Sequence, residues 1–201
     1  MGAEKAGPLS ARSAAILHSG LDEHMEVFRR LGSLAPLIQE AADLVAATLS
    51  QGGKLMLCGN GGSAADSQHL AAELSGRFVD DRRPLAAIAL STDTSALTCI
   101  ANDYGFDEVF SRQVTGLGRE GDCLLAISTS GNSRNVLRAA DAAGAAGIAV
   151  IGLLGRDGGA LRALCDVAIV VPSATTARIQ EAHIFIGHTL CAMVEAALGL
   201  T

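Results

Sequence analysis

The spacing of apolar residues predicts two helices followed by a repeated strand–loop–helix pattern. From about Ser10 to Ser50 the period is helical, with a break near Leu31 to Ala35. Short apolar runs of strand length follow, each ending in a polar or glycine-containing turn and mostly leading into another helical pattern. These runs cover residues 54–58, 85–90, 123–128, 148–154 and 167–171. A last helical pattern spans Thr175 to Leu198.

Strands that are apolar along their whole length are typical of a parallel sheet that is covered on both faces. The sequence therefore predicts an α/β fold, with a five-stranded parallel sheet flanked by helices on both faces. The N-terminal helices are expected to serve oligomer packing. Because no linker or change of composition interrupts the pattern, we assign residues 1–50 to a helical segment of the same domain as residues 51–201.

Composition narrows the function classes. The 201 residues suffice for one compact core, and an aromatic content of 3% without tryptophan favours an α/β core over a β-sandwich. A net charge of −6 without any dense Lys/Arg run argues against nucleic-acid binding. The longest uncharged stretch, Ala142 to Gly155, is too short and glycine-rich to span a bilayer, and no signal pattern precedes the helices. We therefore expect a cytoplasmic protein with no membrane partner.

The five cysteines are odd in number and widely spaced, and most lie in apolar runs. This pattern indicates reduced core residues, with neither a disulfide framework nor a C-x-x-C metal pair. They are Cys58, Cys99, Cys123, Cys165 and Cys191.

A glycine-rich loop, Gly59-Asn60-Gly61-Gly62-Ser63, directly follows the first predicted strand. In open parallel sheets ligands bind at the carboxyl ends of strands. Its glycines permit positive φ and close backbone approach, and Ser63 is expected to cap the next helix, so that backbone amides face an anion. The loop also resembles G-x-G-x-x-A, which leaves open a dinucleotide site with Asp93 as the ribose-binding acid.

A hydroxyl-rich loop, Ser128-Thr129-Ser130-Gly131-Asn132-Ser133, follows the third predicted strand. An ordinary capped turn needs only one of its four hydroxyl residues, whereas a phosphomonoester can use several hydroxyls together with the amides of a helix start. We interpret the loop as a phosphate cradle. A dinucleotide has no use for this second loop, so the two loops together favour a small polyhydroxylated phosphate.

Acid–base candidates lie on the helix after the glycine loop. Asp66, His69 and Glu73 are spaced i, i+3 and i+7, so they share one helix face. An ordinary solvated pair of His69 and Glu73 is the alternative. The stripe begins seven residues after Gly59, however, within reach of whatever the loop holds.

The last helix carries polar residues among its apolar ones. Gln180 and His188 are eight residues apart, roughly 80° around the helix axis, and can line one cleft. His183 points away from His188, and we expect it to be a buried, hydrogen-bonded histidine. Gln180 and His188, together with His69 and Glu73, form a plausible N2O2 ligand set for a divalent metal.

Four motifs in this order resemble the sugar-isomerase (SIS) domain family, specifically the phosphoheptose isomerases. The similarity covers nearly the whole chain from about Asn60 to the end, whereas the N-terminal helices match more in length than in sequence. The motifs are the run from Gly59 to Glu73, the pair Asn102-Asp103, the loop from Ser128 to Ser133 and the run from Arg178 to His183.

The resemblance implies a homotetramer that converts sedoheptulose 7-phosphate to D-glycero-D-manno-heptose 7-phosphate, an early step toward nucleotide-activated heptoses of bacterial surface glycans. It also implies one Zn²⁺ per subunit, with ligands at His69, Glu73, Gln180 and His188, and a catalytic pair of Glu73 and His188. The implied substrate contacts are Asn60, Gly61, Gly62, Ser63, Glu73, Asn102, Asp103, Ser128, Thr129, Ser130, Ser133 and Gln180.

The implied chemistry agrees with the residue types. Moving a carbonyl between C1 and C2 through an enediol needs a base for the carbon-bound proton and an acid or shuttle for the oxygens, which suits Glu73 and His188. Whether Glu73 is mainly a base or a metal ligand stays open, because a carboxylate cannot freely be strong in both roles.

Other SIS proteins are the alternatives. Non-catalytic relatives that bind the bacterial replication initiator have a non-acidic residue and a non-histidine at the positions of Glu73 and His188, whereas this chain keeps both. Sugar-phosphate-sensing regulators and arabinose phosphate isomerases resemble longer chains with an additional module, for which 201 residues leave no room.

Overall fold

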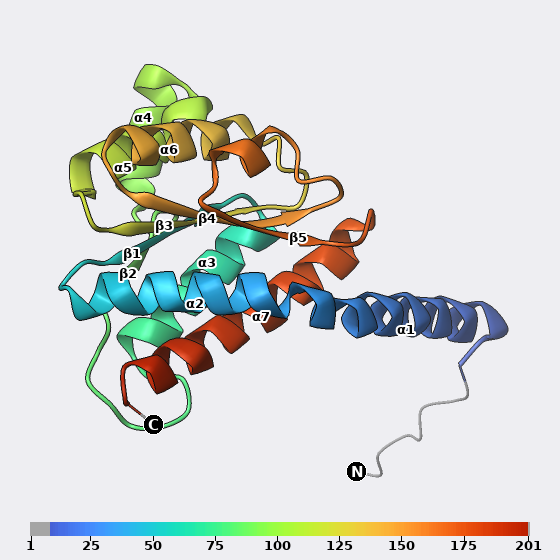
Figure 1. Cartoon of the computed structure of the whole chain (residues 1–201). Helices are drawn as coiled ribbons and strands as arrows, with labels where there is room; N and C mark the ends of the chain where they lie inside the picture. Colours follow the sequence, from blue (N-terminus) through green and yellow to red (C-terminus); the bar gives the residue numbers. More distant parts are fainter. Residues whose placement is uncertain (1–8, 201) are drawn as a thin grey trace, which may run out of the picture.

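The computed structural model describes residues 9–200 and contains a five-stranded sheet between two layers of helices (Figure 1). All strand pairs are parallel, in the order β2-β1-β3-β4-β5. The strands are β1 (Leu55–Gly59), β2 (Ala87–Ala89), β3 (Cys123–Ser128), β4 (Ala149–Gly155) and β5 (Val167–Val171). The predicted α/β class and the five parallel strands are confirmed.

Strand β2 is shorter than the predicted run 85–90. It lies at the edge of the sheet and pairs with β1 only. The amide of Leu85 donates to the Leu74 carbonyl at the end of a helix (3.0 Å) rather than to the sheet. An apolar run therefore overestimates an edge strand whose first residues pack elsewhere.

Seven α-helices are formed by the described residues. One face of the sheet is covered by α2 (Ala35–Ser50), α3 (Gly62–Ser75) and α7 (Thr176–Ala197), and α1 (Ala11–Leu31) continues from this layer beyond the sheet. The other face is covered by α4 (Thr94–Tyr104), α5 (Ser111–Leu117) and α6 (Arg134–Ala145). Three short 3-10 helices, η1 (Gly32–Leu34), η2 (Phe106–Glu108) and η3 (Ala160–Leu164), complete the set.

The helix boundaries follow local signals. The predicted break between α1 and α2 is confirmed as η1, with a proline in the first turn of α2, where its missing N–H costs nothing. The last helix begins and ends within one residue of its predicted limits.

Alternate residues of each central strand point to opposite faces of the sheet and build two cores. Leu57 and Leu125 contribute to the core beneath α2, α3 and α7, whereas Met56 and Leu124 contribute to the core beneath α5 and α6. All four side chains are at most 2% exposed. The continuous apolar runs of the sequence are thus explained by a sheet that is covered on both faces.

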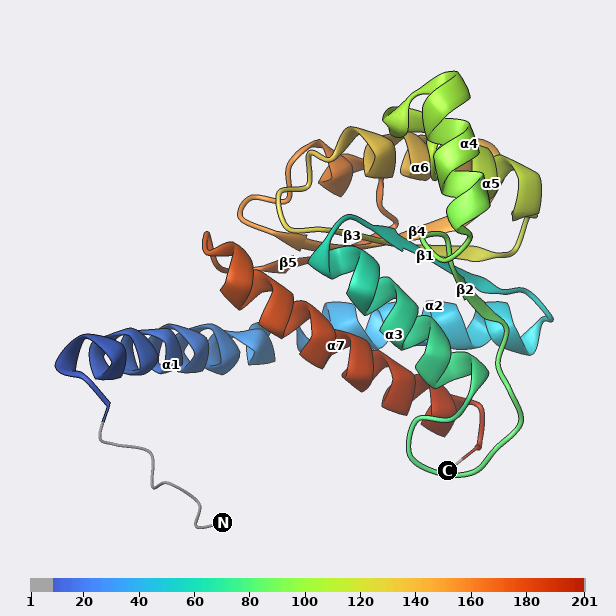
Figure 2. The same cartoon turned by 180° about the vertical axis from the view of Figure 1, so that it is seen from behind.

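Helix α1 projects beyond the rest of the chain (Figures 1 and 2). Only Val27 and Leu31, near its end, are buried. The large apolar side chains that it leaves exposed are Ile16, Leu17, Leu21 and Met25.

The cysteine prediction holds with one correction. All five thiols are free, and Cys58, Cys123 and Cys191 are buried, while Cys165 is partly buried. Cys99 is exposed, contrary to the expectation of a core residue, because α4 contains no buried residue. Within residues 9–200, no helix combines the length and apolarity needed to cross a membrane.

Candidate functional site

The order of the strands determines where the candidate site lies. Strand β1 lies between β2 and β3, so the helices after β1 and β3 leave the sheet on opposite faces and their loops flank one crevice. A reciprocal amide pair joins these two loops, since the Asn60 and Asn135 side chains each donate to the other at 2.8 Å. Asn135, in the first turn of α6, is 3% exposed. The sequence analysis missed it, although an amide two residues after Ser133 was a readable signal.

The glycine loop forms the start of α3, but not with the predicted cap. Gly61, at φ +55°, is the N-cap of α3, and no side chain caps the helix. The expectation that Ser63 caps α3 is wrong, because the turn at Gly61 already places Ser63 inside the first turn, where it is 4% exposed. No side chain caps the start of α3, and the amides of Ser63 and Ala64 donate instead to the carbonyls of Asn60 at 3.0 Å and Gly61 at 3.1 Å.

Gly62 provides the space for a side chain from α7. A Cβ built at Gly62 would lie 2.4 Å from Nε2 of Gln180, so any larger residue would displace that amide. The structure thereby brings Gln180 to the glycine loop. Among the described residues, no hydrogen bond joins Gln180 to His69 or His188. The implied role of Gln180 as a metal ligand stays a prediction.

The hydroxyl loop has unused donors at the start of α6. The Oγ atoms of Ser128 and Ser133 are 3.2 Å apart, and Ser128 Oγ accepts the Gly131 amide at 3.1 Å. Ser133 is the N-cap of α6, yet its hydroxyl makes no capping bond. Thr129 and Ser130 are partly exposed in the same loop. An ordinary N-cap would use the Ser133 hydroxyl on the helix amides, so the absence of that bond is compatible with the predicted phosphate cradle, which stays a prediction.

The acid–base cluster joins two helices that lie side by side (Figure 2). His69 and Glu73 come from α3 and His188 from α7. The Nε2 atoms of the two histidines are 2.8 Å apart, and His69 Nε2 lies 3.2 Å from Glu73 Oε1. The Glu73 side chain is 22% exposed and that of His69 48%. The predicted helix face therefore becomes a cluster that a substrate can reach.

Asp66 lies on the same face of α3 as the cluster. Its Oδ2 atom is buried and has no hydrogen-bond partner. Burial raises the pKa of Asp66, and the nearby charges of His69 and His188 only partly oppose this rise. A buried carboxylate oxygen without a partner is a group that a cation or a hydrogen-bond donor can satisfy.

The cluster has three side chains that can each offer a metal-ligand atom. One ligand atom each from His69, Glu73 and His188 lies within 4.8 Å of the others. A tetrahedral zinc with bonds of about 2.0–2.1 Å separates its ligand atoms by roughly 3.3 Å. The 3.2 Å between His69 and Glu73 matches this edge, and the 2.8 Å between the histidines needs to open by about half an ångström. The residues present thus fit zinc.

Other sequence candidates have different places. Asn102 and Asp103 are exposed at the end of α4, across the sheet from the cluster, and the Asn102 amide donates to the Asp103 carboxylate at 2.8 Å. Asp93, weighed as a ribose-binding acid, caps α4 through the Ala96 amide at 2.9 Å. Within a single chain, none of the three hydrogen-bonds to the cluster.

His183 is the buried histidine that was predicted. It is fully buried, and its Nε2 lies 2.9 Å from the Leu154 carbonyl. Burial lowers the pKa of His183 to about 4, although the bond to Leu154 opposes the shift. A histidine held neutral in this way supports the core and takes no part in the cluster.

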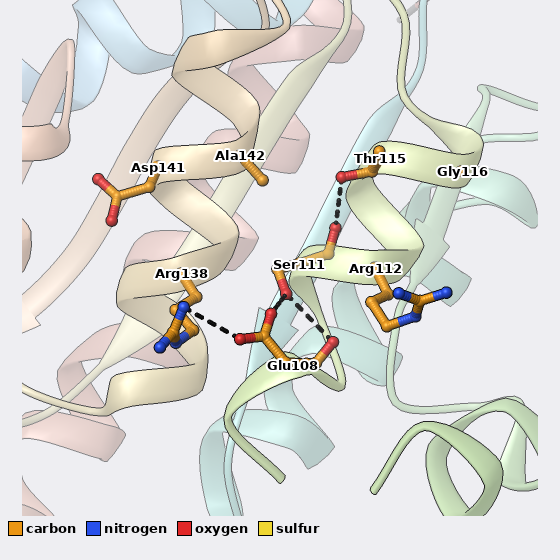
Figure 3. Close-up of a pocket in the computed structure, with 8 residues that line it drawn as sticks. All are labelled: Glu108, Ser111, Arg112, Thr115, Gly116, Arg138, Asp141 and Ala142. Atoms are coloured by element: carbon orange, nitrogen blue, oxygen red, sulfur yellow. Dashed lines mark hydrogen bonds and ion pairs between the residues drawn. The ribbon is translucent and has the colours of Figure 1, made fainter. Parts of the chain in front are cut away.

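A groove of about 530 Å³ lies elsewhere, between α5 and α6 (Figure 3). Three of its polar side chains pair with one another, since Glu108 accepts from Ser111 at 2.6 Å and from Arg138 at 3.0 Å. It contains none of the predicted site residues.

The chain is similar to known proteins over most of its length. Residues 21–155 match the family model described as the SIS domain. The chain is 54% identical over 184 residues to the phosphoheptose isomerase of Helicobacter hepaticus, which covers 92% of this chain and 94% of that protein. Among solved structures, the phosphoheptose isomerase of Neisseria gonorrhoeae is 49% identical with a TM-score of 0.82, covering 92% and 97% of the two chains. That of Francisella tularensis is 38% identical with a TM-score of 0.89, covering 92% and 98%.

Proposed function

The chain belongs to the phosphoheptose isomerases of the SIS-domain family, and we propose that it converts sedoheptulose 7-phosphate to D-glycero-D-manno-heptose 7-phosphate. The observation that carries this proposal is the meeting of Glu73 with His69 and His188 from two neighbouring helices. A protein that only binds a partner has no need of a carboxylate and two imidazoles in contact. The product would feed the synthesis of nucleotide-activated heptoses.

The two loops would bind the substrate by its phosphate and hydroxyl groups. The hydroxyls of the loop 128–133 and the amides at the start of α6 suit the phosphate. The amide of Asn60 keeps one N–H and one lone pair after its pairing with Asn135, and these suit a sugar hydroxyl. Orientation by both loops would present C1 and C2 to the cluster.

Proton transfer then needs two groups. The Glu73 carboxylate would remove the proton from C1 of the ketose, giving an enediol, and return it to C2 to form the aldose. The ring nitrogen of His188 that is not bound to the metal would donate a proton to the oxygen at C2 and recover one from the oxygen at C1.

A Zn²⁺ ion, one per subunit, is part of the proposal. His69, Glu73 and His188 would hold it, with Gln180 as the fourth ligand that the family implies. When bound, the ion would supply Lewis-acid polarisation of the substrate carbonyl. The unpartnered Oδ2 of Asp66 supports a positive group at this place.

We also propose that the chain forms a homotetramer. The exposed apolar stripe of α1 supports it, with Ile16 67% and Leu21 49% exposed on a helix that projects from the chain. A long helix with little tertiary packing is only marginally stable in water, so a second copy is its natural support. Light scattering at micromolar concentration should give about four times the chain mass, and a mass near 20.4 kDa would refute the tetramer.

The decisive experiment is incubation of pure protein with sedoheptulose 7-phosphate, followed by NMR detection of the aldose with and without zinc. Glu73→Gln keeps the shape of the side chain and removes the base, so kcat should fall by at least about a hundredfold. Glu40→Gln, an exposed change on α2, is the matched control and should leave kcat unchanged. The absence of aldose under both conditions would refute the function, and a near-normal kcat of Glu73→Gln would refute the base.

A further inference from the structure

A buried ion pair lies where the two helices of the site end. Arg82 belongs to the segment between α3 and β2, which passes the end of α7 (Figure 2). Its Nε donates to Oε1 of Glu195, in the last turns of α7, at 2.6 Å. The Arg82 side chain is 2% exposed and that of Glu195 1%. Among the ion pairs of residues 9–200, no other has both side chains so completely buried.

The remaining donors of Arg82 hold the end of α3. Nη2 donates to the Glu73 carbonyl at 2.8 Å, and Nη1 donates to the carbonyls of Leu74 at 2.8 Å and Gly76 at 3.1 Å. The last carbonyls of a helix lack partners within the helix and attract a positive charge. Arg82 therefore binds the final turn of α3 and, through Glu195, fastens it to α7.

The same pair reaches both members of the proposed acid–base pair. On the α3 side it holds the main chain of Glu73 itself. On the α7 side, Oε1 of Glu195 also accepts the Phe78 amide at 3.4 Å, and the Phe78 ring lies 5.5 Å from the His188 ring, centroid to centroid. One buried group thus fixes the backbone of the base and the aromatic neighbour of the acid.

Net stability does not account for this arrangement. Removing two charges from water costs about as much as their attraction returns, and a buried ion pair can often be replaced by apolar residues without loss of stability. Proton transfer, in contrast, depends on heavy-atom distances of about 2.6–3.2 Å, and an error of about 1 Å can cost a hundredfold in rate. A rigid guanidinium fork between two helices meets that demand.

We propose that Arg82 and Glu195 are positioning residues that set the register of α3 against α7, and so the placement of Glu73 relative to His188. The inference rests on the proposed function for its kinetic consequences. Both side chains are too deeply buried to contact a substrate, at 2% and 1% exposed. The sequence around Arg82 gives no hint of this role, because the run Asp80-Asp81-Arg82-Arg83 has the pattern of a solvated loop.

The test uses two variants and one control. Arg82→Met with Glu195→Met removes the pair without leaving a buried charge, and Arg82→Lys keeps the charge but loses the fork. Lys54→Met is the control, because it breaks the ion pair between Lys54 and the buried Asp122. These two residues directly precede β1 and β3, at the ends of the strands that lie away from the site. Circular dichroism and urea unfolding establish that each variant is folded at the assay temperature.

With sedoheptulose 7-phosphate, kcat should fall at least tenfold in the double variant and in Arg82→Lys, while KM stays within about twofold. Lys54→Met should keep both constants. A folded double variant whose kcat matches that of Lys54→Met would overturn the inference.

A crystal structure of the double variant gives a readout that does not depend on turnover. The end of α3 should shift along α7, and unchanged placement of Glu73 and His188 would overturn the positioning role. If the wild-type protein forms no aldose, the proposed function fails, and this structural comparison still decides the role of the pair.

Discussion

Gly62→Ala should damage the site while leaving the fold intact. A Cβ at this position would lie 2.4 Å from Gln180 Nε2, whereas ordinary contacts begin at 3.4 Å, so the amide must move by about 1 Å. A displacement of that size in a positioned group can cost about a hundredfold in rate, which corresponds to about 2.7 kcal/mol of transition-state stabilisation. We expect kcat/KM for sedoheptulose 7-phosphate to fall by about ten- to a hundredfold.

Stability should respond differently. Gly62 is the first residue of α3 and does not adopt a positive φ, and the colliding atom is the far end of a flexible side chain. Alanine also lowers the entropy of the unfolded chain, so the free energy of unfolding should stay within about 1 kcal/mol of wild type. Urea unfolding followed by circular dichroism measures it.

The control is Gly144→Ala, an exposed helical glycine of α6 with nothing within 4 Å of its built Cβ. It should stabilise the protein by about 0.5–1 kcal/mol and leave kcat/KM unchanged. In a Gln180→Ala background, Gly62→Ala should cause no further loss, because the atom it collides with is gone. An unchanged kcat/KM of Gly62→Ala, or an equal loss in both backgrounds, would refute the reasoning.

Three further results are expected. Ser133→Ala removes one phosphate donor used alike in the ground and transition states, so KM should rise several-fold with kcat nearly kept, a loss of about 1–2 kcal/mol; an unchanged KM would move the phosphate to the loop at Asn60. His183 is neutral when folded, with a pKa of about 4 against 6.5 when unfolded, so acid favours the unfolded state and the protein loses up to about 3 kcal/mol as the pH falls from about 6.5 to 4; His183→Gln should lose this part of the pH dependence of urea unfolding, and identical curves would contradict the assignment. Chelation should lower activity and zinc restore it, whereas full activity in demonstrably metal-free protein would reduce the site to a hydrogen-bonded acid–base cluster.

The sequence located the helix that carries the base and the loops beside it because their signals are local. Glycines after an apolar run, hydroxyls before a helix, and the spacing of His69 and Glu73 each depend on a few neighbouring residues. The prediction that Ser63 caps α3 was wrong for the same reason, because it considered only neighbouring residues. A positive φ at Gly61 and the packing of Gln180 against Gly62 decide where α3 begins, and Gln180 is more than a hundred residues away.

By itself the sequence determined the α/β class, the length of the last helix and the residue types of the cluster, since period and local spacing survive in any environment. Only the tertiary structure decided that His69 meets His188, that Asn135 ties the two loops together, and that Arg82 fastens α3 to α7. These contacts join residues 75 to 119 positions apart, and each depends on the crossing of two elements packed on a shared core. No local pattern encodes that crossing, because it is fixed by the whole sheet and the helices that cover it.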